Sequence, residues 1–370
     1  MNYGNLDFTL FSIFVNTLII TFMIKYENMN SRKETMMNQR NRHIIYIAIL
    51  TALLIVSVFI SIMLGSVALN VSDIIYTLTH KPTNDVTSLL IYNVRMPRAT
   101  GAVLAGMGLA CAGAILQSVM NNSLASPNTI GVNSGAGFAV MIGMFIFNGS
   151  SSYSPLFAFA GALFTTLIIF FLANIGDSSR TTIILAGITV SSFLSAGINT
   201  IKLLDTDITI NITTFMIGTL SGITFKSIAL PAIGIIIGVI VSFIFSKHMN
   251  VLSLGDDIAR SLGLNVTCTR FMLLCVSSLL AGCVVSYAGL LSFVGLIVPH
   301  IARKMFGNDA RLLLPCCALL GAIFVTLCDL IGRTIFAPYE LPAGIIMSFI
   351  GGPFFLYLLL KKKGGRRVNA

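Results

Sequence analysis

The chain has 370 residues, of which 56% are hydrophobic and only 10% are charged, and its formal net charge is +10. Soluble domains of ordinary composition carry about 25% charged residues, so the composition excludes an ordinary water-soluble domain. The basic residues lie between apolar blocks and at the C-terminus rather than on one continuous face. This placement argues against nucleic-acid binding and favours membrane lipid as the environment.

Residues 1–43 form an N-terminal extension that contains one apolar stretch, at 8–24. The stretch lacks an early positive region and a clear cleavage site, so a cleaved signal peptide is not expected. We favour an additional transmembrane segment at 8–24 over a signal-like segment or an upstream extension of the reading frame. A basic cytoplasmic linker is expected after it.

Residues 44–363 contain ten apolar blocks, most of them near the length of about 20 residues that a helix needs to cross the hydrocarbon of a bilayer. Because backbone polar groups in lipid must be satisfied within the segment, the blocks predict helices. We therefore expect an all-α membrane protein with about ten transmembrane helices, and a basic cytoplasmic tail at 364–370. The expected spans are 44–64, 98–119, 129–147, 155–173, 183–201, 228–246, 267–288, 289–303, 313–332 and 342–360.

Two of these blocks contain unusual residues. The block 289–303 is short and contains Gly289, Gly295 and Pro299, which predicts a broken or partial span. Gln117 lies inside the span 98–119, where it could hydrogen-bond across helices or line a pathway; we expect the structural role.

The distribution of Lys and Arg predicts the topology. If the ten spans start inside, seventeen of the 23 basic residues lie on the inner side, where cytoplasmic loops retain positive charge. Both ends of the ten-span unit, including the C-terminus, are therefore expected to be cytoplasmic. The six outer basic residues are Lys81, Arg95, Arg98, Lys202, Lys226 and Arg333.

Arg95, Arg98 and Arg333 stand at the outer ends of apolar blocks, against the general trend. One interpretation is that Arg95 and Arg98 reach toward the headgroups while Arg333 pairs with Asp329, one helical turn earlier. The other is that an anionic partner binds outside, since a guanidinium suits bidentate capture of carboxylates. Asp329 is the single acidic residue within an apolar block. An ion-coupled transporter needs more buried ionisable groups, so an external energy source is favoured.

The inner segment 250–266 is too polar to span and predicts a short helix, a glycine break and a second turn. Apolar residues such as Leu254, Ile258 and Leu262 alternate with charged ones, a pattern that suits a surface helix inserted into a cytoplasmic partner. A helix lying on the headgroups is the alternative.

The sequence lacks the common catalytic and nucleotide-binding motifs. It contains no H-E-x-x-H, no G-x-S-x-G and no P-loop, which makes an intramembrane enzyme improbable and places any ATP hydrolysis on another chain. The seven cysteines lie mostly in or beside apolar blocks and are interpreted as small core residues. His300 has no second histidine nearby, so neither a metal site nor a cofactor is expected.

Several long motifs follow one another along the chain. They are RMPRATGAVLAGMGLACAGAILQSVMNNSLASPNTIGVNSGAG at 95–137, ILAG at 184–187, LGDDIARSLG at 254–263, GLLSFVGLIVPHIARKMFGNDARLLLP at 289–315, DLIGR at 329–333 and ELPAGIIMSFIGGPFFLYLLLKK at 340–362. In the same order, these motifs resemble those of the FecCD-type permeases, which import iron-siderophores, haem and cobalamin. The resemblance covers about Ile44 to Lys363.

This resemblance implies a ten-span bundle like that of the cobalamin importer permease, in a bacterial plasma (inner) membrane. It also implies a second permease subunit, identical or paralogous, two cytoplasmic ATPase subunits and an extracytoplasmic substrate-binding protein. Arg95, Arg98 and Arg333 match the residues on which the binding protein docks. The positions matching the ATPase-coupling helix are Leu254, Gly255, Asp256, Asp257, Ala259, Arg260, Leu262 and Gly263, and those of the cytoplasmic gate region are Ser178, Ser179, Arg180, Thr181 and Thr182.

The sequence therefore predicts the permease subunit of an ABC importer, with a ferric siderophore as the expected cargo. Haem or cobalamin import by the same kind of permease is the first alternative. An ion-coupled secondary transporter is the second.

Overall fold

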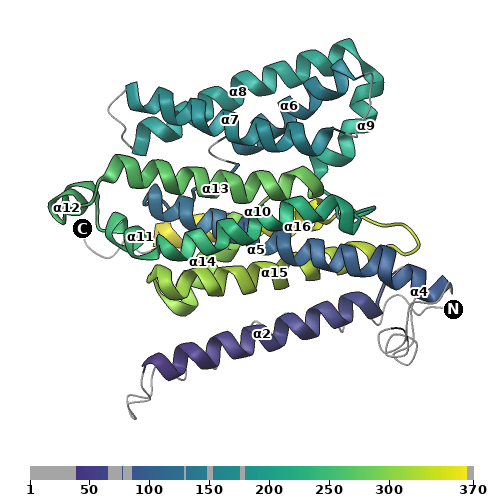
Figure 1. Cartoon of the computed structure of the whole chain (residues 1–370), viewed down its shortest axis with the longest axis horizontal. Coiled ribbons are helices and arrows are strands. Elements are labelled where there is room, and N and C mark those ends of the chain that lie inside the picture. Colours follow the sequence, from purple (N-terminus) through teal and green to yellow (C-terminus); the bar gives the residue numbers. More distant parts are fainter. Residues whose placement is uncertain are drawn as a thin grey trace. The chain divides into compact units, whose positions relative to one another are not determined.

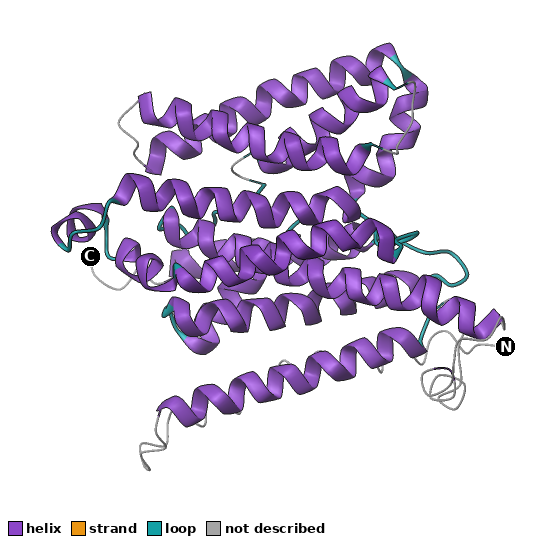
Figure 2. Ribbon diagram, in the orientation of Figure 1, coloured by secondary structure: helices purple, strands orange, loops and turns teal. Residues whose placement is uncertain are grey.

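The computed structural model describes residues 39–65, 77, 86–128, 131–147, 153–175 and 180–364. The chain divides into two compact units, 1–48 and 49–370, and of the first unit only the start of one helix is described. Within the described residues every regular element is a helix and none is a strand, which confirms the all-α fold (Figure 2). The expected segment 8–24 and residues 365–370 of the tail lie outside the described residues.

Figure 1 gives the order of the helices along the chain. The described helices are α2 (Gln39–Met63), α4 (Val86–Leu90), the π-helical turn η1 (Ile91–Arg95), α5 (Met96–Val119), α6 (Val132–Ile146), α7 (Ser154–Ile175), α8 (Arg180–Leu204), α9 (Thr206–Ile217), α10 (Phe225–Ile244), α11 (Ser246–Ser253), α12 (Asp256–Ser261), α13 (Val266–Ala288), α14 (Val294–Phe306), α15 (Ala310–Thr334) and α16 (Ala343–Gly364).

Seven helical stretches within the described residues are long and apolar enough to cross a membrane: α2, the continuous α4–η1–α5, α7, α8, α10, α13 and α15. Helices α6 and α16 supply shorter apolar segments, and α14 has 13 residues. Together these helices match the ten expected spans in order.

The structure corrects two boundaries and adds one helix. The helix expected at 98–119 begins at Val86, because the π-helical turn η1 joins it to α4 without a break. The block expected at 289–303 is not helical before Val294, since Gly289 and Phe293 both adopt positive φ angles. Helix α9 was not predicted, because its twelve residues are too short and too polar to give a span signal.

Helix α5 lies at the centre of the packing and contacts α10, α13, α14 and α15. Its backbone comes very close to two neighbours, because glycine faces glycine at both crossings. Gly106 meets Gly321 of α15, and Gly113 meets Gly295 of α14; a Cβ atom on either α5 residue would overlap the opposite carbonyl. In lipid, where packing replaces the hydrophobic drive, small residues allow this close approach.

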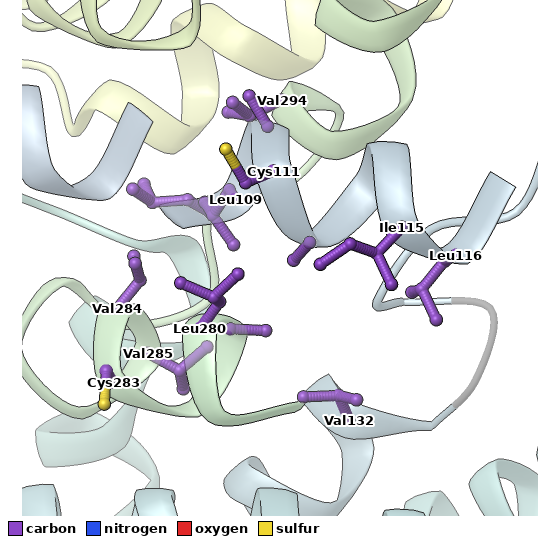
Figure 3. Close-up of a cluster of buried hydrophobic side chains, with 14 of the residues drawn as sticks. Leu109, Cys111, Ile115, Leu116, Val132, Leu280, Cys283, Val284, Val285 and Val294 are labelled. Carbon is purple, nitrogen blue, oxygen red and sulfur yellow. The ribbon is translucent and has the colours of Figure 1, made fainter. Parts of the chain in front are cut away.

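Buried apolar side chains fill the spaces between these helices. Figure 3 shows part of this core, in which Leu109 of α5 and Leu280 of α13 point into the same space. Five of the seven cysteines are buried, including Cys111 and Cys283, as expected for small core residues. Cys275 is half-buried and Cys268 is exposed at the start of α13.

The helices around this core expose large apolar side chains. Examples are Ile55 of α2, Phe171 of α7 and Leu230 of α10, each more than half exposed. Exposure of apolar side chains to water is unfavourable, whereas apolar lipid chains accept it. The helices also satisfy their own backbone groups, as lipid requires.

Replacing Gly113 with valine is expected to destabilise the protein by at least about 1–3 kcal/mol, the usual range for overpacking a filled core. The added side chain would force α5 away from Gly295. The midpoint of thermal unfolding in detergent measures the effect. Gly352→Ala is the matched control, since no atom lies within 4 Å of its added methyl group. An unchanged midpoint for Gly113→Val would show that the α5–α14 crossing is not tight.

Candidate functional site

Five charged residues gather where α5 begins and α15 ends; we call Arg95, Arg98, Asp329, Arg333 and Glu340 the arginine cluster. The three arginines are only 4%, 6% and 3% exposed, and Asp329 is 1% exposed. Two distinct tasks are visible in the cluster: Arg95 and Arg333 bind a helix end, and Arg98 binds two carboxylates.

Arg95 and Arg333 satisfy the carbonyl groups at the C-terminal end of α2. The last four carbonyls of a helix have no partner within the helix. Here the Leu64 amide donates to Ile60 O, while Arg333 Nη2 donates to Ser61 O at 2.6 Å. Arg95 Nη1 donates to the next two carbonyls, at 2.6 and 2.7 Å. All four carbonyls are thus paired, and α2 is tied to two other helices.

Arg98 holds two carboxylates at once. Its Nε lies 3.0 Å from both oxygens of Asp329, and its Nη2 donates to Asp329 Oδ1 at 3.0 Å. The remaining nitrogen, Nη1, donates to Glu340 Oε2 at 2.6 Å. Asp329 also faces Arg333, whose Nε is 3.5 Å from Oδ2, which confirms the pair expected from the spacing of these two residues.

The π-helical turn η1 leads directly into α5 beside Arg95. Pro97 has no amide hydrogen, so the α-helical bond to residue 93 cannot form. The Met96 amide instead donates to Ile91 O, five residues earlier, which widens the turn. Arg95 ends this widened turn and reaches α2, whereas Arg98 lies in the first turn of α5 and reaches α15.

Docking of a partner on Arg95, Arg98 and Arg333, which the family resemblance implies, stays a prediction. Their burial and their internal partners do not fit side chains that reach headgroups. Glu340, which the sequence analysis did not single out, belongs to the cluster as well. The sequence feature that could have identified Glu340 is its position in the motif ELPAG, just before an apolar block.

At the other end of α5 the chain forms the predicted helix–glycine–turn segment. Helix α11 ends at Ser253, Gly255 adopts φ +113°, and α12 follows (Figure 1). Leu254, Ile258 and Leu262, spaced four residues apart, are all more than half exposed. Of the other residues expected in coupling, Asp257, Arg260 and Gly263 are exposed, Gly255 and Asp256 are half-buried, and Ala259 is buried.

Two polar contacts fix α11 and α12 to the long helices. Arg270 of α13, 2% exposed, donates from Nη2 to Asp256 Oδ2 at 2.7 Å. Asn250 of α11 donates to Asp309 and accepts a hydrogen bond from the Ala310 amide, both at 2.8 Å. A displacement of α12 would therefore act directly on α13, and a displacement of α11 on α15.

Of the expected gate region, Ser178 and Ser179 lie outside the described residues. Arg180 is the first residue of α8, Thr181 is exposed and Thr182 is half-buried. The gate role itself stays a prediction.

One face of α8 forms a groove of about 610 Å³ that the sequence analysis did not identify. Residues recur along it at the helical period, and its polar members are Ser191, Ser192, Ser195 and Asn199, joined by Asn128 from the turn after α5. None of the groove-lining residues is charged. The apolar members are Ile184, Ile188 and Ala196.

Gln117 has the structural role that was expected. Its Nε2 donates to Gly295 O and Leu296 O, both at 3.4 Å. The carbonyl of Gly295 would otherwise bond the amide of residue 299, but Pro299 has none. Arg303 of α14 completes the contact by donating to Gln117 Oε1 and to Ser118 Oγ. His300 lies edge-on to Phe354 of α16.

Comparison with known proteins gives one consistent result. The FecCD transport family matches residues 53–361. The chain belongs to this family. The iron-uptake system permease FeuB of Bacillus subtilis is 37% identical over 314 residues, covering 84% of this chain and 93% of FeuB. The Fe(3+)-citrate import system permease YfmE of the same organism is 36% identical, covering 88% and 98% of the two chains.

The hemin transport system permease HmuU of Yersinia pestis is 32% identical and covers 89% of this chain and 99% of its own. Among solved structures, an inward-facing ABC transporter assigned to the metal-chelate type superposes with a TM-score of 0.74 at 28% identity. That match covers 85% of this chain and 98% of the solved one. This FecCD-family chain is thus a multi-pass membrane protein.

Replacing Asp329 with asparagine should destabilise the FecCD-family chain by about 3–5 kcal/mol, the usual effect of breaking a buried ion pair. Arg98 would keep only Glu340, and Arg333 would lose its carboxylate. Thermal unfolding in detergent measures the loss. The double variant Arg98→Met/Asp329→Leu should be less destabilised than Asp329→Asn, because no buried charge of that pair remains. A larger loss in the double variant would contradict this account.

Proposed function

We propose that this chain is the membrane-spanning permease subunit of an ABC importer that carries a ferric siderophore into the cytoplasm. Two cytoplasmic ATPase subunits supply the energy, and a second permease subunit, identical or paralogous, completes the pathway. An extracytoplasmic substrate-binding protein delivers the cargo. The chain lies in a bacterial plasma (inner) membrane with its C-terminus in the cytoplasm.

The observation that carries this proposal is an exposed apolar stripe, formed by Ile258 of the short helix α12 and by Leu254 and Leu262 just outside its two ends. An apolar stripe flanked by charged residues suits insertion into a groove of another protein. The ion pair between Arg270 and Asp256 supports the coupling role, because it joins that stripe to α13. Motion of the ATPase would reach the membrane-spanning helices through this link.

The groove on α8 is our candidate for the cargo pathway. Its hydroxyl and amide groups offer hydrogen bonds without formal charge, so they would hold a bulky chelate weakly enough to let it leave. The described residues of the expected gate region, Arg180, Thr181 and Thr182, belong to the first turn of the same helix. Ferric siderophore is chosen as cargo because iron transport recurs in the names of the relatives, and haem is the nearest alternative.

A secondary transporter is the competing candidate, and the arginine cluster argues against it. A proton or ion relay needs a buried carboxylate that can change its charge. Asp329, the buried carboxylate within the described spans, is paired with two guanidinium groups, which fits a structural ion pair and not a relay.

Proteoliposomes containing the permease, the ATPase and the binding protein should accumulate labelled ferric siderophore only when ATP is present on the same side of the membrane as the ATPase. The ATPase must hydrolyse the ATP, because the permease sequence contains no P-loop. Vesicles that lack the ATPase are the control. Uptake that continues without the ATPase, or that follows a proton gradient, would contradict the proposal.

Replacing Ile258 with aspartate should weaken binding of the ATPase by at least about tenfold, because a charge would enter an apolar contact. Pull-down of the purified ATPase and ATP-driven uptake measure the effect. Ser261→Ala is the matched control, since this exposed residue of α12 bonds only within its own helix, to Ile258 O. Full ATPase binding by Ile258→Asp would move the coupling surface elsewhere.

A further inference from the structure

The two carboxylates that Arg98 holds differ in accessibility. The Asp329 side chain is 1% exposed, whereas the Glu340 side chain is 31% exposed and its partner Arg98 is 7% exposed. Glu340 therefore covers Arg98 from the accessible side, while Asp329 binds it from within the helix bundle.

The geometry also divides the guanidinium between the two acids. Asp329 takes the edge formed by Nε and Nη2, and Glu340 takes Nη1. Removal of Glu340 would leave the bond between Arg98 and Asp329 in place and open one donor to the outside. An incoming carboxylate could take that donor without dismantling the buried pair.

The chain around Glu340 allows such an exchange. Every residue from Ile335 to Glu340, in the connection between α15 and α16, is exposed. The next residue is held, because the Leu341 amide donates to Gly332 O at 2.8 Å. Glu340 can thus leave Arg98 by rotation of its own side chain, without movement of α16.

The positive charge of the arginine cluster favours binding of an acidic side chain from a partner. Three guanidinium groups face two carboxylates, so the cluster has one net positive charge, and it has two when Glu340 points away. Charge-assisted bonds between guanidinium and carboxylate are strong and directional. An acidic side chain of a protein partner would restore the pairing that Glu340 gives up.

We propose that Glu340 is an internal competitor that occupies Arg98 until an acidic side chain of the substrate-binding protein replaces it. This inference rests on the proposed function, in which that protein docks on the arginine cluster. Docking then exchanges one ion pair of Arg98 for another, while the buried pair with Asp329 stays in place. The exchange lowers the affinity of docking and makes it reversible, which a transport cycle requires.

The test is docking of the purified binding protein to the complete transporter in nanodiscs of one lipid composition, measured by surface plasmon resonance. Glu340→Gln removes the competing charge and keeps the shape of the side chain. We expect its Kd to fall by about 3- to 10-fold, with a smaller gain at high salt, because partly exposed charge pairs are screened. Asp205→Asn is the control, since it removes one negative charge from the loop between α8 and α9.

Arg98→Gln and the double variant Arg98→Gln/Glu340→Gln complete the experiment. Arg98→Gln should weaken docking, and in its background Glu340→Gln should give no gain. Unchanged or weaker docking by Glu340→Gln, together with weaker docking by Arg98→Gln, would overturn the competitor role and leave the docking role intact. Docking that is unaffected by every variant would overturn the docking surface itself. If Arg98→Gln does not fold, the docking affinity of Glu340→Gln by itself tests whether Glu340 is a competitor.

Discussion

The close approach of α5 to α14 and α15 is the constraint on which the rest of the structure depends. Glycine faces glycine at both crossings, Gly106 with Gly321 and Gly113 with Gly295. In a bilayer the surrounding chains are as apolar as the helix, so contact at this distance replaces the hydrophobic drive. The crossings hold α5 in the middle of the bundle, and polar groups at its two ends bind the neighbouring helices.

The polar groups near the two ends of α5 bind backbone carbonyls that lack a partner within their own helix. At one end, Arg95 and Arg333 bind the carbonyls that α2 leaves unpaired at its C-terminus. At the other end, Gln117 binds the carbonyl that Pro299 leaves unpaired in α14. Each side chain satisfies a backbone group where water is scarce, and each one joins a peripheral helix to the centre. These hydrogen bonds therefore fix the positions of the helices relative to α5.

The same arrangement provides a route between the two ends of the permease. The arginine cluster joins α2, α5 and α15, and α5 continues from there to α14 at the Gly113–Gly295 crossing. Near that end, Asn250 and Arg270 connect the short helices α11 and α12 to α15 and α13. The contacts at either end thus involve helices that extend to the other end.

The sequence by itself determined the helical blocks, their order, the break before α14, the Asp329–Arg333 pair and the membership of a family. Hydropathy and motifs are properties of neighbouring residues, and a pair one helical turn apart is equally local. Only the tertiary structure decided that Arg98 shares two carboxylates, because Asp329 and Glu340 lie 231 and 242 residues away along the chain. It also decided the caps on α2 and the groove on α8. Such contacts depend on how helices cross, and the helix crossings follow from packing across the whole bundle, which no local pattern contains.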